Sequence, residues 1–182
     1  DTETQYNKLF HHIGDKYNSG IENFEKVIKG TTLPNIVSRY FSHLSDSEKK
    51  SLEDEVHAYE ENMDYTKEIA GSFAFVKMLK DNGIKVGLVT SSDDTKMASV
   101  YQQNDVRKIF DVVVTANRIT IGKPDPMCFL LAAQDLGYEP KDCCVFEDSF
   151  AGVEAGKRAG MKVIALDTTH SAEQLKEKCS IT

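Results

Sequence analysis

The chain has 182 residues, which is enough to bury a sizeable core in one or two domains. Hydrophobic residues make up 40% and charged residues 28%, as in an ordinary soluble protein. The net charge of -7 argues against a nucleic-acid backbone as the main partner. Because the chain is net negative, an anionic substrate would need a local group of positive charges. No apolar run is long enough to span a membrane.

The four cysteines, Cys128, Cys143, Cys144 and Cys179, lack the paired spacing of a zinc site or a disulfide framework. No signal-peptide pattern opens the chain. We therefore expect a reducing, cytoplasmic setting. Cys143 and Cys144 belong to a short apolar run, and we expect them to be small core residues.

The first third of the chain shows only helical patterns. Apolar residues recur at helical spacing up to about residue 63, and no strand pattern occurs before residue 84. Pro34 suits the first turn of a helix, and Ser45 with Glu48 forms a capping-box pattern. We expect a helical domain over residues 4–68.

Strand and helix patterns alternate in the rest of the chain. The expected strands are residues 85–89, 111–115, 143–146 and 162–166. Strands that alternate with helices of this length predict a parallel sheet with helices on its faces. The expected fold class is therefore α/β, with a doubly wound parallel-sheet (Rossmann-like) core over residues 69–182.

Two candidate anion-binding features lie in this second part. Thr90, Ser91 and Ser92 end one expected strand and can offer hydroxyls and backbone amides to an anion. Lys123 stands in a rigid turn before a helix and can place a point charge on a phosphate. Taken singly, the first is as well explained by a helix cap and the second by an exposed loop lysine.

Two adjacent carboxylates, Glu147 and Asp148, end the strand expected at 143–146. Open α/β sheets place their ligands at the carboxyl ends of strands. Two ionised carboxylates repel each other there unless a cation or hydrogen-bond donors offset the charge, and oxygen ligands of this kind suit Mg²⁺. The alternative is a turn in which Ser149 merely caps the next helix.

Three segments together resemble a known family. Residues 89–92 (Val-Thr-Ser-Ser), 122–126 (Gly-Lys-Pro-Asp-Pro) and 145–156 (Val-Phe-Glu-Asp-Ser-Phe-Ala-Gly-Val-Glu-Ala-Gly) look like the second, third and fourth motifs of the haloacid dehalogenase-like hydrolases. The branch they resemble most is that of the β-phosphoglucomutase-like phosphatases, which carry an inserted helical cap.

The resemblance implies a role for each motif residue. Thr90 would bind the transferring phosphoryl group, and Lys123 would neutralise that group and orient the nucleophile. Asp148, with Glu147 beside it, would belong to a Mg²⁺ site. These roles predict that Lys123→Ala or Asp148→Ala lowers turnover and leaves thermal stability nearly unchanged.

One departure from the family concerns the nucleophile. The family begins with a strand that ends in Asp-x-Asp, whose first Asp forms an aspartyl-phosphate, whereas this chain begins at Asp1-Thr2-Glu3. We therefore expect the first core strand and the nucleophile to lie upstream of residue 1, and the chain by itself to be inactive. In that case residues 85–90 and 143–147 should not pair with each other, because they would flank the missing strand.

The preferred function is that of a Mg²⁺-dependent phosphatase that acts, as a monomer, on a small phosphorylated metabolite such as a sugar phosphate. A sugar phosphomutase of the β-phosphoglucomutase type is the first alternative. By resemblance, the mutases carry an Arg after a Lys-Gly pair, whereas residues 29–33 contain none, and Tyr6 replaces their cap-entrance His. The second alternative is a non-catalytic fragment or binding module.

Overall fold

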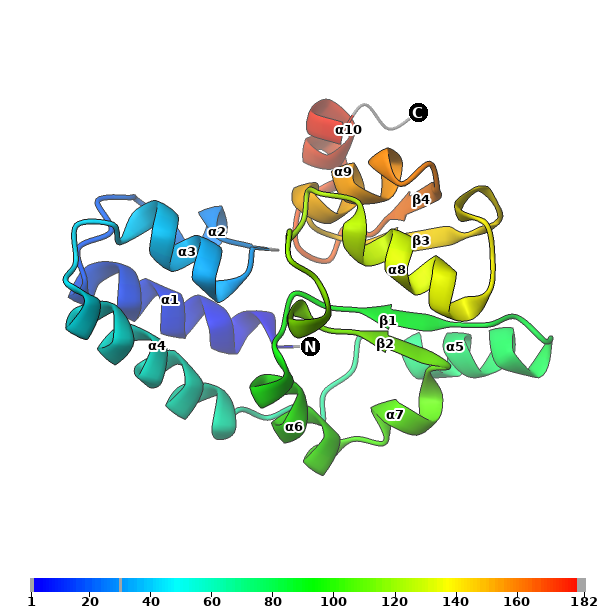
Figure 1. Ribbon diagram of the computed structural model, residues 1–182, viewed down its shortest axis with the longest axis horizontal. Helices are drawn as coiled ribbons and strands as arrows, with labels where there is room; N and C mark the ends of the chain where they lie inside the picture. The colour runs from blue at the N-terminus through cyan, green and yellow to red at the C-terminus, as the bar shows by residue number, and fades with distance from the viewer. Residues whose placement is uncertain (1, 30, 180–182) are drawn as a thin grey trace.

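The structure is a computed structural model that describes residues 2–29 and 31–179. In Figure 1 the N-terminal helices lie to the left of an α/β part. These helices, called the helical region below, are α1 (Glu3–Lys16), α2 (Phe24–Val27), α3 (Leu33–Tyr40) and α4 (Asp46–Glu61). The described residues before 84 contain no strand, as the sequence predicted.

Local capping explains where the helices of this region begin. The Ser45 side chain accepts a hydrogen bond from the Glu48 backbone N–H, and the Glu48 carboxylate accepts one from the Ser45 N–H at 2.8 Å. This reciprocal pair is the predicted capping box, and it satisfies backbone donors that the first turn of α4 leaves free. Pro34 occupies the first turn of α3, where its missing N–H costs nothing.

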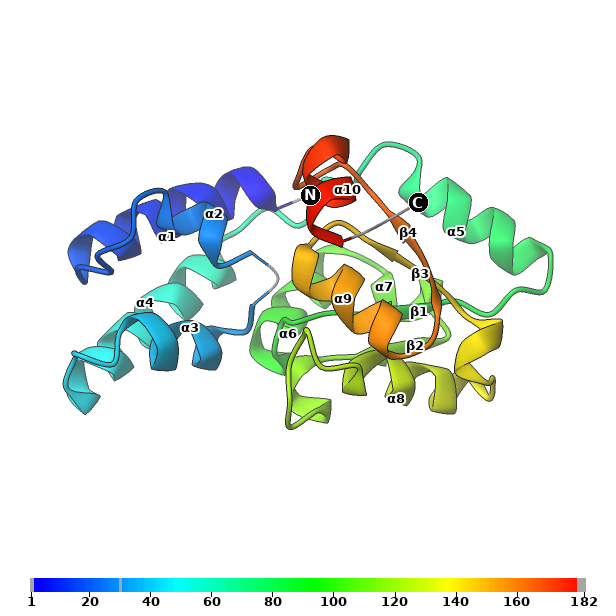
Figure 2. The same ribbon diagram turned by 90° about the horizontal axis from the view of Figure 1, so that it is seen from above.

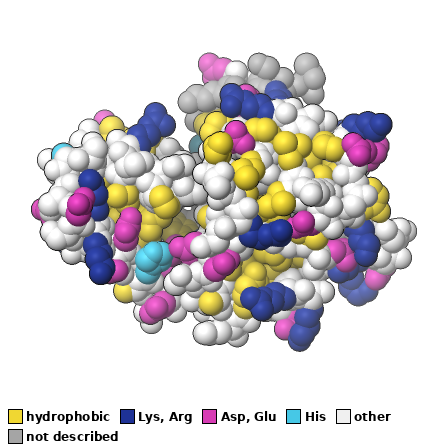
Figure 3. All heavy atoms as spheres, in the orientation of Figure 1, with side chains coloured by type: hydrophobic (Ala, Val, Ile, Leu, Met, Phe, Trp, Pro, Cys, Tyr) yellow, Lys and Arg dark blue, Asp and Glu magenta, His cyan; other side chains and the backbone are white. Residues whose placement is uncertain are grey.

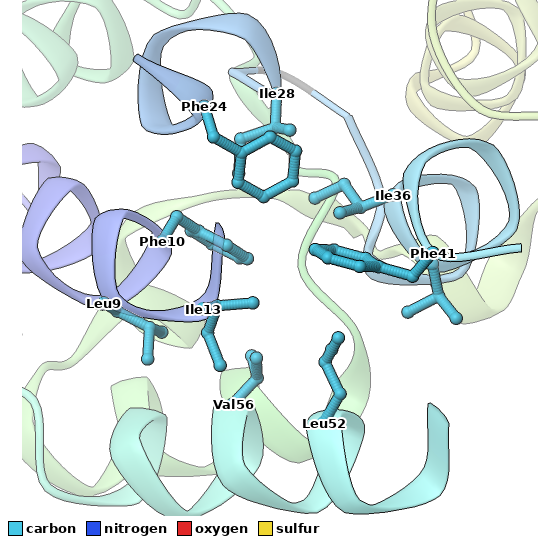
Figure 4. Close-up of a cluster of buried hydrophobic side chains, with 10 residues drawn as sticks. Leu9, Phe10, Ile13, Phe24, Ile28, Ile36, Phe41, Leu52 and Val56 are labelled. Atoms are coloured by element: carbon cyan, nitrogen blue, oxygen red, sulfur yellow. The ribbon is translucent and has the colours of Figure 1, made fainter. Parts of the chain in front are cut away.

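The helical region packs around its own hydrophobic cluster (Figure 4). Phe41, Ile13 and Leu52 are fully buried, and the Phe24 ring meets the Phe41 ring edge to face at 5.4 Å between centroids. All buried members of this cluster lie between residues 9 and 56. It shares no buried residue with the clusters of the α/β part. The domain boundary between residues 68 and 69 remains a prediction.

The remaining elements follow in alternating order. They are α5 (Ser72–Asp81), β1 (Gly87–Val89), α6 (Asp94–Gln103), α7 (Val106–Ile109), β2 (Val112–Val114), η1 (Ala116–Arg118), α8 (Met127–Leu136), η2 (Pro140–Asp142), β3 (Cys144–Glu147), α9 (Phe150–Arg158), β4 (Lys162–Ala165) and α10 (Ala172–Cys179). The four predicted strands are present, each one to two residues shorter or shifted by one. The sequence analysis did not predict α7 or α10.

The strands form two parallel pairs rather than one continuous ladder. Within the described residues β1 pairs only with β2, in the register Leu88 to Val113, and β3 pairs only with β4, in the register Val145 to Val163. The prediction that the strands at 85–90 and 143–147 do not pair with each other is confirmed. The facing edges of β1 and β3 therefore lack ladder partners in this part of the chain.

Two helices cover one face of these strands (Figure 2). Helix α8 packs on β1 and β2, and α9 packs on β3 and β4. The cluster beneath them contains Val114 and Val145 together with small residues such as Ala132, Ala133 and Ala155. Small side chains let the helices approach the strands closely, which fixes the strand ends that carry the site.

The opposite face is poorly covered, and one prediction fails there. Cys144 is exposed and Cys143 is only half-buried, so they are not both the small core residues expected from the apolar run. Phe146 is 45% exposed although its ring meets Phe75 edge to face. Alternation along β3 points Cys144 and Phe146 to the face away from α9, where little of the described chain covers them, whereas Cys143 packs against the cluster on the α9 side. Figure 3, in the orientation of Figure 1 with α8 toward the viewer, shows that hydrophobic side chains also reach the surface on the other side of the α/β part.

Among the described helices, none combines the length and the apolar character needed to cross a membrane.

Candidate active site

A pocket of about 290 Å³ lies between the helical region and the carboxyl ends of β1 and β3. All six residues that the sequence analysis singled out line it, although they come from three separate segments: Thr90, Ser91, Ser92, Lys123, Glu147 and Asp148. The structure therefore brings together every candidate site residue. The size of the pocket suits a small organic ligand.

Thr90 follows β1 directly. Its backbone N–H donates to Val114 O at 2.9 Å, which continues the β1–β2 ladder by one residue. Its hydroxyl oxygen accepts a hydrogen bond from the Ser92 N–H at 3.1 Å, which folds the chain into a tight turn at the strand end. This turn places Thr90, Ser91 and Ser92 at the pocket wall, where the Thr90 hydroxyl and the Ser91 amide could donate hydrogen bonds to an anion.

Lys123 and Glu147 form a buried ion pair at the base of the pocket. The Lys123 ammonium donates to Glu147 Oε1, and the two side chains are 7% and 10% exposed. The ammonium also lies 5.0 Å from the centroid of the Phe129 ring. A buried charge requires such a partner, and the pairing fixes an otherwise flexible lysine in one position.

The other oxygen of Glu147 turns back onto the start of α9. Oε2 accepts hydrogen bonds from the Asp148 N–H at 2.9 Å, from the Ser149 N–H at 3.0 Å and from the Ser149 hydroxyl at 3.0 Å. A side chain at Gly152 would overlap the Glu147 carboxyl group. The absence of a side chain at Gly152 therefore makes room for the carboxylate that holds Lys123.

Asp148 is held by two hydroxyls. Its Oδ2 accepts hydrogen bonds from Thr168 Oγ1 at 2.8 Å and from Thr169 Oγ1 at 2.6 Å. Different partners thus stabilise the charges of the two neighbouring carboxylates. Lys123 pairs with Glu147, and the two threonine hydroxyls donate to Asp148. Sequence reasoning missed both threonines, which lie three and four residues after the end of β4.

Glu147 and Asp148 differ in how well they suit a Mg²⁺ ion. Within the described residues, no group of three or more His, Cys, Asp and Glu side chains could hold a metal ion. Both Glu147 oxygens are engaged by Lys123 and by the start of α9, which makes Glu147 a poor ligand in this arrangement. The Asp148 carboxylate lines the pocket and suits a hard cation as one oxygen ligand among several.

The helical region supplies the opposite wall, which sequence reasoning largely missed. The Tyr6 hydroxyl donates to the Glu60 carboxylate, and Lys96 lies 4.2 Å from the Tyr6 ring centroid. Burial, reinforced by the Glu60 carboxylate, raises the pKa of Tyr6 well above its ordinary value. Tyr6 therefore stays a neutral donor at physiological pH. A buried carboxylate on a helix leaves no mark in the sequence that distinguishes it from a solvated one.

The fold and the pocket define an α/β core with polar residues gathered at its strand ends beneath a wall of helices. The family model described as "Haloacid dehalogenase-like hydrolase" matches residues 1–166. The chain belongs to that family, as its motifs predicted.

Two curated relatives illustrate the similarity to known phosphatases. The chain is 30% identical over 171 residues to the "Phosphorylated carbohydrates phosphatase" of Thermotoga maritima, which covers 90% of this chain and 78% of the relative. It is 37% identical over 109 residues to "Hexitol phosphatase A" of Escherichia coli, which covers 60% of this chain and 50% of the relative. The chain thus spans about half of the second relative.

Solved structures share the fold. A β-phosphoglucomutase from Clostridium difficile superposes with a TM-score of 0.77 at 22% identity, over 99% of this chain and 92% of the other. A hydrolase from Pseudomonas syringae gives a TM-score of 0.81 at 19% identity, over 97% and 83%. At these identities the likeness establishes the architecture alone, and it supports the predicted α/β fold class.

Proposed function

We propose that this protein is a Mg²⁺-dependent phosphatase that acts as a monomer on small phosphorylated metabolites, sugar phosphates among them. The observation that carries the proposal is the convergence of Thr90, Lys123 and Asp148 on one small pocket. A buried ammonium, strand-end hydroxyls and a carboxylate are what phosphoryl transfer needs, because its catalysis rests on positioning and charge stabilisation. The names of the curated relatives support the substrate class.

Each residue has a distinct part in this proposal. The hydroxyls of Thr90 and Ser92 and the amide of Ser91 bind the phosphoryl oxygens, and Lys123 neutralises their charge. Glu147 positions Lys123 through the buried ion pair. Asp148 contributes to Mg²⁺ binding, and the bound ion would add positive charge beside the phosphoryl group.

The nucleophile, in this proposal, is an aspartate that precedes residue 1 on a strand between β1 and β3. Support comes from the facing edges of those strands, which lack ladder partners in the described chain. Unpaired inner edges and exposed side chains such as Phe75 and Phe146 are unfavourable in water. A strand inserted there would deliver its carboxyl end to the pocket. Residues 4–68 would then act as a cap that excludes water from the aspartyl-phosphate.

We prefer phosphatase activity over mutase activity because of the residues that the helical region contributes to the pocket. Tyr6 lines the pocket where, by resemblance, a mutase carries a histidine, and its hydroxyl is committed to Glu60. The segment 29–33 contains no arginine to grip a second phosphate, although Gly30 lies outside the described residues.

Release of inorganic phosphate tests the proposal. The protein, with any segment that precedes residue 1 included, is assayed on a panel of sugar and polyol monophosphates with Mg²⁺ and with a chelator. We expect release that depends on Mg²⁺. Interconversion of glucose 1-phosphate and glucose 6-phosphate without net release would indicate a mutase, and neither reaction on any substrate would favour a binding module.

A further inference from the structure

The two threonines that follow β4 bind only one of the two oxygens of Asp148. Thr168 Oγ1 donates to Asp148 Oδ2 at 2.8 Å, and Thr169 Oγ1 donates to the same oxygen at 2.6 Å. The other oxygen, Oδ1, accepts no hydrogen bond from the described residues, and it is not one of their fully buried, unpartnered atoms. Asp148 therefore lines the pocket with one oxygen held and one oxygen open to a ligand.

Packing holds these threonines in place from both sides. On the strand side, the Leu166 N–H donates to Glu147 O at 2.7 Å, so the pairing of β4 with β3 continues to the end of β3. On the other side, the His170 ring stacks on the Phe150 ring of α9, with 3.8 Å between centroids and 14° between planes. Beyond this stack, α10 packs on α9. The two hydroxyls thus come from an anchored segment.

The hydrogen bonds to Oδ2 affect which cation Asp148 can hold. Mg²⁺ demands a nearly ideal octahedron and takes few carboxylate oxygens, whereas Ca²⁺ accepts more oxygens and often binds both oxygens of one carboxylate. With two hydroxyls on Oδ2, Asp148 offers a single oxygen, which suits Mg²⁺. Hydrogen bonds to a ligating carboxylate also fix its orientation, and their loss typically weakens metal binding about 10- to 100-fold.

We propose that Thr168 and Thr169 are positioning residues, which present Asp148 Oδ1 alone to the cation and make the site favour Mg²⁺ over Ca²⁺. Neither threonine contacts the metal in this proposal, because each acts through Asp148. Thr169 should contribute more than Thr168, since Thr169 lines the pocket and is half-buried whereas Thr168 is exposed. The inference rests on the proposed function, because it takes Asp148 as a ligand of Mg²⁺.

Metal binding without substrate tests this role separately from catalysis. The protein, with any segment that precedes residue 1 included, is titrated with Mn²⁺ by electron paramagnetic resonance, and Mg²⁺ or Ca²⁺ then displaces the bound Mn²⁺ to give each Kd. The variants are Thr168→Val, Thr169→Val, the double variant and Thr169→Ser. Valine keeps the shape of threonine without the hydroxyl, and serine keeps the hydroxyl. Thr66→Val is the matched control, since Thr66 Oγ1 donates to Asp64 Oδ1 at 2.6 Å outside the pocket.

We expect the Kd of Mg²⁺ to rise about 10-fold or more in the double variant, and by a smaller factor in Thr169→Val. The Kd of Ca²⁺ should rise less, because the freed Oδ2 can join Oδ1 on the larger ion, so the Kd of Ca²⁺ divided by that of Mg²⁺ should fall. Thr169→Ser and Thr66→Val should match the wild type. Thermal melting checks that each variant is folded, and Thr169→Val alone carries the test if the double variant is not.

Several results would overturn the assignment. They are an unchanged Kd of Mg²⁺ in the valine variants, an equal rise for Mg²⁺ and Ca²⁺, a Thr169→Ser variant that binds Mg²⁺ no better than Thr169→Val, and no binding of Mg²⁺ to the wild type. If the threonine effect appears but no substrate is hydrolysed, the proposed function fails and the positioning role stands. If hydrolysis depends on Mg²⁺ but the threonine effect is absent, the positioning role fails and the proposed function stands.

Discussion

The helical region and the α/β part bury their apolar residues to very different extents. The helical region closes around large side chains, with Phe41, Ile13 and Leu52 fully buried. In the α/β part, α5 has no buried residue, and Phe75 and Phe146 remain about half exposed. The helical region thus completes its core with its own residues, whereas the strands of the α/β part have one face and two inner edges that the described chain leaves incomplete.

The two regions contribute different kinds of residues to the pocket. The α/β part places Thr90, Lys123 and Asp148 at strand ends, where buried pairing fixes them. The helical region contributes Tyr6 and Glu25 from a self-contained core, which gives the opposite wall a stable support. Changes in the α/β part should therefore alter chemistry, and changes in the helical core should alter stability.

The largest effect is expected for Lys123→Ala. Loss of this charge should lower turnover by about 10²-fold or more, because charge stabilisation dominates phosphoryl transfer. The burial of the Lys123–Glu147 pair also revises the sequence-based expectation for stability. Removing one partner leaves a buried charge uncompensated, so the Tm should fall as well.

A double variant separates these two effects. Lys123→Ala with Glu147→Gln removes the uncompensated charge, so it should recover most of the Tm while turnover stays low. Lys141→Ala, at an exposed lysine, serves as the control. Turnover near wild type in Lys123→Ala would contradict the role of this lysine.

A core truncation in the helical region should affect stability alone. Leu52→Ala deletes a fully buried side chain and should cost about 2–5 kcal/mol of unfolding free energy, because the cavity cannot collapse completely. Phe146→Ala in the α/β part should cost clearly less in the 182-residue chain, because Phe146 is 45% exposed. Denaturant unfolding of both variants provides the measurement, and equal losses would remove the contrast between the two regions.

Two glycines of α9 distinguish overpacking at the site from overpacking in the core. Gly152→Ala would overlap the Glu147 carboxyl group, and Gly156→Ala would place a methyl group 2.7 Å from Val163 Cγ2. Each should cost about 1–3 kcal/mol in stability. Only Gly152→Ala should also lower turnover strongly, because it displaces the carboxylate that positions Lys123. If Gly156→Ala lowered turnover as much as Gly152→Ala does for the same loss of unfolding free energy, Glu147 would not be the residue that positions Lys123.

The smallest effect concerns the entry to β1. Asp111 accepts a hydrogen bond from the Val86 N–H at 2.9 Å, and that bond, with Lys80 and Lys85 nearby, holds the pKa of Asp111 below its usual value. A depressed carboxyl pKa contributes stability that is present at neutral pH and is lost as pH falls through the folded-state pKa. Asp111→Asn should therefore be slightly less stable than wild type at pH 7, and the difference should vanish as the pH falls from about 4. A difference that does not depend on pH would contradict this account.

Local chemistry explains how much the sequence could predict. Strand ends, the Ser45 capping box and the Ser149 N-cap depend on neighbouring residues, so the fold class and the six pocket residues followed from pattern and resemblance. The exposure of Cys144, the hydroxyls of Thr168 and Thr169 on Asp148, and the unpaired oxygen of Glu25 depend on segments distant in sequence. These features required the packed structure.

The central claim is that the phosphoryl group binds between Thr90 and Lys123. A structure of the full-length protein with bound phosphate tests it most directly. The account predicts a phosphate within hydrogen-bond distance of Thr90 Oγ1 and Lys123 Nζ, with Glu147 still holding the lysine. A phosphate bound elsewhere, with Thr90 and Lys123 making no contact to it, would contradict the account.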